Sequence, residues 1–383
     1  MTFRMNTLIN CSNLKSGGGL QVADSVVCML HLYSQHKFVV VLSSYMNDTL
    51  RRLQIQHASN IRIVTYNINN NFSTIVHGRD AFLDALVVQE KIDAVLTVFG
   101  PSRWNPKCKH LSGFAMPHLV LPESPFFTRM GYFERAKHRI RSRLLLYFFY
   151  RSAEWFWTEN QYISERLQKQ LSLKKIYTVS NCCNQVFDNP SQWRHDKRLS
   201  SFDGVTCLTI SAYYAHKNFE ILIDIALILQ DKHPEFKFRF VLTLTEDQLP
   251  IPDAIRNHFI FLGKVDVTEC PSLYEQSDIM LLPSLLECFS ASYPEAMKMG
   301  VPIVTTDVEF AYGLCGNAAC YYSAVDPEAA AEAIYKVATD KEYAAQLVAN
   351  GKEQLKKFDN YEQRADKLIK ILEEIVNETG SNT

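Results

Sequence analysis

Short apolar runs alternate with amphipathic segments along the first half of the chain. The runs are rich in aliphatic and aromatic residues and predict seven strands, at 6–11, 37–43, 61–66, 94–99, 119–121, 153–158 and 175–179. Stretches with helical spacing, such as 20–33 and 75–91, lie between them. Nearly continuous apolar strands that alternate with helices are typical of a parallel sheet with helices on both faces.

A polar segment interrupts this alternation at residues 188–203, where charged residues and Pro190 are typical of a linker. The alternation then resumes, with strands predicted at 205–211, 237–244, 258–262, 279–282, 302–305 and 319–322. The pattern therefore predicts an α/β protein with one domain over residues 1–188 and a second over 204–360. Open α/β sheets bind ligands at the carboxyl ends of their strands, so we expect the site in the cleft between the domains.

The composition agrees with two globular domains and excludes several classes of protein. The 383 residues are 47% hydrophobic and 21% charged, and a chain of this length has a prior of about two domains. Forty Lys and Arg balance 41 Asp and Glu, whereas a dedicated nucleic-acid-binding protein carries an excess of basic groups. Ten cysteines are scattered without the CxxC pairs of zinc or thioredoxin-type sites. The chain begins without a signal-peptide pattern and contains no membrane-spanning apolar run, so we expect a cytoplasmic protein.

Three glycines, at positions 17 to 19, follow the first predicted strand and open the first predicted helix. Glycine lets the backbone approach a ligand closely, and free N–H groups at a helix start favour an anion. Gly18 and Gly19 are therefore candidate donor-binding residues, although a tight strand-to-helix turn explains them equally well. The segment fails as a dinucleotide fingerprint, because Val22 stands where that motif requires Gly or Ala.

Two glutamates, Glu287 and Glu295, are separated by seven residues between a predicted buried strand and a predicted helix. The helix is predicted over 294–299. Pro294 suits its first turn, which puts Glu295 beside the positive end of its dipole. Carboxylates accept paired hydrogen bonds from hydroxyl groups, while free backbone N–H groups at a helix start hold phosphate. The stretch therefore suits a polyhydroxylated, phosphate-bearing ligand. A Glu that merely favours the first turn of a helix is the alternative for Glu295.

This stretch resembles the E-x7-E motif of retaining glycosyltransferases with the GT-B fold, in the family 4 class (glycosyl transferases group 1). The similarity extends through Phe261-Leu262-Gly263 on one side and Gly300-Val301-Pro302 on the other, and covers most of residues 175–340. It implies two Rossmann-like domains that face each other across a central cleft. The first would bind the acceptor, the second would bind a nucleotide-sugar donor, and a C-terminal helix within 361–383 would pack back on the first domain.

The resemblance also implies roles for individual residues. Glu295 would hold the ribose hydroxyls, Glu287 would contact a hydroxyl of the transferred sugar, and Lys217 would bind the diphosphate. A cation at that place neutralises the leaving group as its charge develops. Backbone groups would contact the sugar and phosphates at Phe289, Ser290, Ala291 and Ser292. Backbone groups would read the nucleobase at Gly263, Lys264 and Val265.

The first domain is expected to supply the acceptor site. Arg103 and Trp104 follow a predicted strand, and this mixture of a cation and an aromatic ring suits an acceptor that carries sugar or phosphate. Members of the family often present a histidine from this domain near the donor sugar, and His118 is the candidate here, with His110 in the same segment. A hydrogen-bonded structural histidine is the alternative for His118.

One position departs from the family pattern. Many members carry an Arg five residues before the diphosphate-binding Lys, and here that position is Ala212. Either another cation, such as His216 or Arg103, replaces it, or the site stabilises its leaving group less strongly. The departure keeps a second hypothesis open, a catalytically silent sugar-nucleotide-binding protein of the same fold. A Rossmann-type NAD(P) oxidoreductase or epimerase is a third, against which the failed fingerprint argues.

The expected reaction is transfer of a sugar, with retained anomeric configuration, from a nucleotide sugar to a glycan or lipid-linked acceptor in cell-surface polysaccharide biosynthesis. The chain contains no Asp-x-Asp motif, so we expect neither a metal nor a cofactor. No obvious carboxylate nucleophile is present, and we expect front-face attack through an oxocarbenium-like state.

A basic segment bears on possible partners. Residues 123–151 contain seven Lys or Arg against two Glu, and lead into the apolar run 144–150. A cationic stretch beside aromatic residues suits the surface of an anionic membrane, here its cytoplasmic face, where lipid-linked acceptors occur. A solvated helix face next to a core segment is the alternative.

Overall fold

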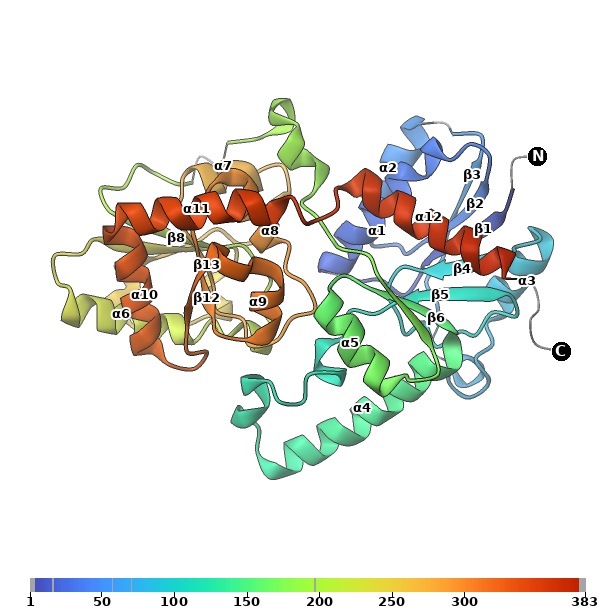
Figure 1. The fold of residues 1–383 in the computed structure, drawn as a ribbon, viewed down its shortest axis with the longest axis horizontal. Helices are drawn as coiled ribbons and strands as arrows, with labels where there is room; N and C mark the ends of the chain where they lie inside the picture. Colours follow the sequence, from blue (N-terminus) through green and yellow to red (C-terminus); the bar gives the residue numbers. More distant parts are fainter. Residues whose placement is uncertain (1–3, 16, 57, 70, 196–197, 379–383) are drawn as a thin grey trace. The chain divides into compact units, whose positions relative to one another are not determined.

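The computed structural model describes residues 4–15, 17–56, 58–69, 71–195 and 198–378 (Figure 1). They form two compact units, each built on its own parallel sheet. The first unit contains the described residues up to Leu121, then Gly131–Asn181, and those from Asp359 onward; the second contains Pro122–Met130 and Cys182–Phe358. The predicted linker and terminal helix extend in part over 196–197 and 379–383, which lie outside the described residues.

The sheet of the first unit has seven strands in the order β3-β2-β1-β4-β5-β6-β7. All neighbouring pairs are parallel. Its strands are β1 Asn6–Cys11, β2 Lys37–Leu42, β3 Ile61–Thr65, β4 Ala94–Thr97, β5 Lys109–Gly113, β6 Trp155–Thr158 and β7 Lys175–Thr178. Its helices are α1 Gly18–Met29, α2 Asn47–Gln56, α3 Ala81–Gln89, α4 Tyr132–Ser152, α5 Gln161–Gln170 and α12 Tyr361–Asn377.

The sheet of the second unit has six strands in the order β10-β9-β8-β11-β12-β13, again all parallel. Its strands are β8 Val205–Thr209, β9 Phe238–Leu242, β10 Phe259–Phe261, β11 Ile279–Leu282, β12 Ile303–Thr306 and β13 Ala319–Tyr322. Its helices are α6 Ile221–Lys232, α7 Cys270–Glu275, α8 Ser292–Met299, α9 Glu309–Cys315, α10 Pro327–Thr339 and α11 Lys341–Leu355. The two parallel sheets confirm the predicted α/β class.

The last helix, α12, lies in the first unit, where its apolar face completes the core beneath α1 and β1. Leu368, Ile369 and Leu372 are buried there with Val26 and Ile9. The chain thus returns to its first unit after finishing the second.

The predicted strand at 119–121 is wrong, and the strand in that region is β5. Residues 117–119 form a short 3-10 turn instead, opened by Pro117. The sequence of β5, Lys-His-Leu-Ser-Gly, has few apolar residues, although the strand is buried. His110 is accommodated because its ring bonds Thr97 Oγ1 at 2.8 Å and the carbonyl of Ser152. Burial lowers its pKa to about 4, so this histidine is neutral and structural.

The segment predicted as a linker belongs to the second unit. The chain passes into that unit after Asn181, and residues 185–188 and 190–192 form short 3-10 turns. The Trp193 indole donates to the carbonyl of Val186 at 2.8 Å, and Asp188 pairs with Lys298 of α8. These contacts hold the segment within the second unit, although its polar composition is typical of a linker.

Candidate functional site

The candidate site of the second unit lies where two neighbouring strands end. Strands β8 and β11 pair directly, so the segments that follow them leave the sheet side by side. Lys217 ends the short turn Ala215–Lys217 after β8, and Glu287 lies on the loop after β11. The Lys217 ammonium and the Glu287 carboxylate form an ion pair, and both side chains are about nine-tenths buried. Residues seventy positions apart in sequence are thereby brought into direct contact.

Backbone and hydroxyl contacts hold these two segments together. The N–H of Leu285 donates to the carbonyl of His216 at 2.8 Å. Ser292 Oγ donates to the carbonyl of Ile210 at 3.1 Å, which ties the first residue of α8 to the end of β8. The loop that carries Glu287 is therefore fixed at both ends to the segment that carries Lys217.

A turn of unusual backbone geometry presents Lys217. Asn218 follows it with φ of +58°, in the left-handed region that Asn tolerates better than most residues. Its amide is buried, and neither its oxygen nor its nitrogen has a hydrogen-bond partner within the described ranges. In the sequence, the signal for this turn is the Asn that directly follows Lys217.

Glu295 is buried in the first turn of α8 and accepts a hydrogen bond from the hydroxyl of Tyr274 on α7 at 3.0 Å. Burial raises the pKa of this carboxyl to about 7, and the Tyr274 hydrogen bond opposes the shift. The group therefore lies near the midpoint of its titration at neutral pH. Tyr274 was not among the predicted residues; the period of α7 indicates only that it faces the core.

Free backbone donors occupy the turn between the two glutamates. In the part of the chain that the structure describes, the N–H groups of four residues have no acceptor: Phe289, Ser290, Ala291 and Ser292. Helix α8 begins at Ser292, two residues before the predicted start, and has no side-chain cap. A helix start with uncapped donors favours an anion, and the same loop carries Glu287, the partner of Lys217.

The residues predicted to read a nucleobase lie at the same edge of the same sheet, after β10. Gly263 has φ of +64°, which requires glycine, and its N–H donates to the carbonyl of Leu244 at 2.8 Å. Lys264 is exposed and Val265 is half-buried. In the strand order β10 is separated from β8 by β9.

One segment from the first half of the sequence is built into this site. Residues 122–130 belong to the second unit. Ser124 is buried and its hydroxyl donates to the carbonyl of Leu285 at 2.7 Å. The Phe126 ring meets His216 edge-on, with centroids 6.3 Å apart, and His216 stacks on Tyr214. Burial lowers the pKa of His216, which favours its neutral imidazole.

The remaining predicted residues lie in the first unit. The Arg103 guanidinium stands over the Phe148 ring at 5.0 Å, and His118 contacts His138 edge-on with centroids 5.4 Å apart. Gly18 and Gly19 open α1 after Gly17, whose φ of +75° requires glycine. A Cβ on Gly18 would meet nothing within 4 Å, so packing of the protein alone does not explain that residue.

The prediction for Trp104 requires correction. The side chain is 0% exposed and packs in the core beneath α3, and its indole N–H donates to Asp84 at 3.1 Å. No ring face is left for an acceptor to stack on. An aromatic residue after a strand suggested a binding surface, but this ring fills the space between the sheet and α3.

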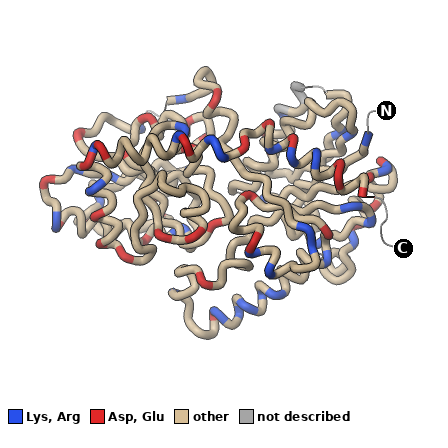
Figure 2. Tube along the Cα trace, in the orientation of Figure 1, with Lys and Arg blue, Asp and Glu red and all other residues tan. Residues whose placement is uncertain are grey.

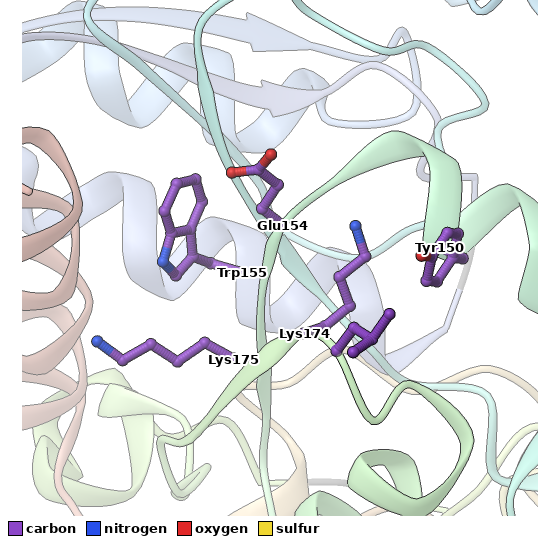
Figure 3. Close-up of a pocket in the computed structure, with 6 residues that line it drawn as sticks. Tyr150, Glu154, Trp155, Lys174 and Lys175 are labelled. Atoms are coloured by element: carbon purple, nitrogen blue, oxygen red, sulfur yellow. The ribbon is translucent and has the colours of Figure 1, made fainter. Parts of the chain in front are cut away.

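A surface pocket of about 280 Å³ lies elsewhere, at the C-terminal end of α4 (Figure 3). Its lining residues are Tyr150, Glu154, Trp155, Leu173, Lys174 and Lys175. None of them was predicted as a site residue. All six lining residues belong to the first unit.

Comparison with known proteins agrees with the predicted family. Residues 204–340 match the sequence model of the family "Glycosyl transferases group 1". An uncharacterized glycosyltransferase of Haemophilus influenzae is 26% identical over 124 residues, which cover 30% of this chain. The match spans about a third (33%) of that relative's length.

Solved structures resemble the chain over nearly its whole length. A glycosyltransferase from Rickettsia africae gives a TM-score of 0.70 at 15% identity, covering 98% of this chain and 100% of that one. HepE from Anabaena, in complex with UDP and glucose, gives a TM-score of 0.66 at 15% identity, covering 96% and 99%. These likenesses establish the GT-B fold of the predicted family.

Proposed function

We propose that this chain, whose residues 204–340 belong to the group 1 glycosyltransferases, transfers a sugar from a nucleoside-diphosphate donor with retention of anomeric configuration. The observation that carries the proposal is the buried Lys217–Glu287 pair beside four backbone N–H groups that lack acceptors. A diphosphate needs positive potential, and a sugar needs hydroxyl acceptors. The site offers both on two segments that follow neighbouring strands, β8 and β11. The UDP and glucose bound by HepE, a protein of the same fold, favour a uridine nucleotide.

The ion pair suggests what happens when the donor binds. A diphosphate that reaches Lys217 competes with Glu287 for the ammonium. The released carboxylate is then available to accept a hydrogen bond from the sugar. Glu295, with its pKa of about 7, can accept from the ribose hydroxyls once it is ionised. We infer that donor binding breaks the Lys217–Glu287 ion pair, so that Lys217 contacts the diphosphate and Glu287 contacts the sugar.

In the proposed reaction the bond between the anomeric carbon and the diphosphate oxygen breaks. The acceptor oxygen forms the new bond on the same face of the sugar, and its proton passes to the departing phosphate oxygen. Lys217 and the N–H groups of residues 289–292 stabilise the negative charge that develops on the leaving group. With these groups in place, we expect neither a metal nor a cofactor to be required.

The acceptor is proposed to be a glycan or lipid-linked sugar of a cell-surface polysaccharide, bound on the first unit. Arg103 and His118 remain candidates there, while Trp104 does not. The proposed location is the cytoplasm, at the inner face of the membrane.

The test is turnover of nucleotide sugars by the purified chain, with product configuration read by NMR. We expect hydrolysis or transfer with UDP sugars, and an initial product with the configuration of the donor. Lys217→Ala should lower turnover by about 10²–10³-fold, the usual effect of removing one group that stabilises developing charge. The matched control is Lys232→Ala, which removes a Lys–Glu pair on α6 and α10, away from the site.

Two results would oppose the proposal. Full activity of Lys217→Ala would contradict the role of Lys217 in binding the diphosphate. A product with inverted anomeric configuration would contradict the retaining mechanism. Binding of nucleotide without turnover on any acceptor would support the silent binding protein that Ala212 leaves open.

A further inference from the structure

Helix α4 is buried in the first unit near its C-terminal end, and His138 in its first half contacts His118. Phe148 and Phe149 are buried, and the Phe149 ring packs against Phe114 and Phe156 with centroids 5.0 and 6.1 Å apart. Toward the N-terminus nearly every side chain is exposed or half-buried. About four turns of the helix therefore carry a surface that the core of the unit does not use.

The exposed side of α4 carries an apolar stripe. Phe133, Ile140, Leu144 and Tyr147 are 85%, 70%, 54% and 54% exposed. At about 100° per residue, their spacings of seven, four and three residues place them within an arc of roughly 60°. Exposed apolar residues scattered singly are ordinary, but four aligned along one helix face indicate a contact surface.

Cations border this stripe on both sides. By the same helical geometry, Lys137 and Arg141 lie along one side and Arg139 and Arg143 along the other. Within the described ranges none of these four has a hydrogen-bond or ion-pair partner, and the helix contains a single acidic residue, Glu134. Figure 2 shows the Lys and Arg bands following one another along the helix. The positive charge of this face is therefore not neutralised by the protein.

The pocket of Figure 3 lies at the C-terminal end of the same helix. Tyr150, the last exposed aromatic residue of α4, lines that pocket together with Leu173 and Lys174. Leu173 is 82% exposed, and the Lys174 ammonium stands 4.4 Å from the Tyr150 ring centroid. An exposed apolar side chain beside a cation is again the combination seen along the helix.

We propose that α4 binds the surface of an anionic lipid bilayer and lies in the plane of the membrane. An apolar stripe flanked by Lys and Arg is the pattern of an interfacial helix: the stripe enters the boundary between headgroups and acyl chains, and the cations meet the lipid phosphates. No helix in the described part of the chain is long and apolar enough to cross a bilayer. The proposal goes beyond the donor site and does not depend on it.

The experiment is cosedimentation of the full chain with vesicles of phosphatidylcholine alone or with about one third phosphatidylglycerol. We expect at least tenfold stronger partition onto the anionic vesicles, and a clear loss at 0.5 M salt because screening weakens the attraction. Phe133→Ser with Ile140→Ser, and separately Lys137→Gln with Arg141→Gln, should each lower partition by tenfold or more. The matched controls are Val88→Ser, an exposed apolar residue of α3, and Lys169→Gln with Lys352→Gln.

Several outcomes would overturn the proposal: no partition onto anionic vesicles, equal partition onto neutral vesicles, or equal losses in the control variants. If the wild type is a dimer without lipid and the Phe133→Ser, Ile140→Ser variant is not, the stripe mediates association of two chains and the membrane proposal is wrong. Binding to DNA in place of vesicles would show a general polyanion site, which also overturns the proposal. Donor hydrolysis in the absence of lipid should be unchanged in the α4 variants. Failure here is thus distinguishable from failure of the proposed function.

Discussion

Glu295 shows how a buried carboxylate, once ionised, acts against the stability of its own fold. Burial in the first turn of α8 raises its pKa from 4.5 to about 7, so the folded state holds the proton more tightly than the unfolded chain. The stability contributed by this protonated group is complete below pH 4.5 and is lost as pH rises through 7. At pH 8 the ionised carboxylate lowers the free energy of unfolding by on the order of 3 kcal/mol.

We therefore predict that Glu295→Gln raises the free energy of unfolding by about 2–3 kcal/mol at pH 8 and changes it little at about pH 4. The amide keeps an oxygen that can accept from Tyr274 but cannot ionise. Chemical denaturation at the two pH values measures the difference. An equal effect at both pH values would contradict the assigned titration. The same variant should bind nucleotide more weakly, because an amide is a poorer acceptor for the ribose hydroxyls.

Individual residues also show where sequence reasoning stops. The spacing and neighbours of Lys217, Glu287 and Glu295 form a motif that can be recognised in the sequence, and the structure brings Lys217 and Glu287 into contact. The roles of the three residues stay predictions. Tyr274 could not be predicted, since an aromatic residue on an apolar helix face has the same pattern whether or not its hydroxyl meets a carboxylate. Trp104 was assigned to a surface and lies in the core, because its position after a strand does not reveal what packs over it.

At the scale of elements, the loop that bears Glu287 depends on a segment far from it in sequence. Ser124 Oγ donates to the carbonyl of Leu285 at 2.7 Å in a buried position. Ser124→Ala leaves that carbonyl without a hydroxyl donor, and we predict a loss of about 1–2 kcal/mol in the free energy of unfolding. We also predict several-fold weaker nucleotide binding, because the loop is less firmly held.

Thr128→Ala is the control for this prediction. Its hydroxyl bonds the carbonyl of Pro125 within the same segment at an exposed position. Chemical denaturation measures the free energy of unfolding of both variants, and calorimetry measures their affinity for nucleotide. If Ser124→Ala binds nucleotide as tightly as the wild type, the segment does not support the loop.

Most strands of both sheets could be predicted from the sequence, since buried parallel strands are nearly continuous apolar runs. Strand β5 could not, because its His110 is satisfied by contacts with β4 and α4 that local composition does not encode. The start of α8 was predicted two residues late, since Pro294 marks a first turn without marking its first residue.

At the scale of the molecule, the division of the chain was harder to predict than its fold. Polar composition marked residues 188–203, whereas the chain changes units after Asn181 and again after Phe358. The nine residues 122–130 belong to the second unit although the sequence on both sides belongs to the first. Such a short insertion depends on a few contacts, such as that of Ser124, and has no signature in composition or periodicity.

The near-neutral net charge of the whole chain likewise conceals two opposite local arrangements. The candidate site places a buried cation against a carboxylate, and α4 carries four cations, Lys137, Arg139, Arg141 and Arg143, that have no hydrogen-bond or ion-pair partner among the described residues. The family match and the fold account for the first arrangement. The exposed cations of α4 belong to the surface that we propose to bind an anionic membrane.

The most direct test of the account is calorimetric titration of UDP into the wild-type chain, Lys217→Ala and Lys232→Ala. We predict one site per chain, with affinity reduced at least tenfold in Lys217→Ala and unchanged in Lys232→Ala. That result would place the diphosphate on the cation that now pairs with Glu287. Equal affinity for UDP in all three proteins would contradict the role of Lys217 in binding the diphosphate. No binding of UDP, GDP or ADP to the wild type would contradict the proposed nucleotide-sugar site itself.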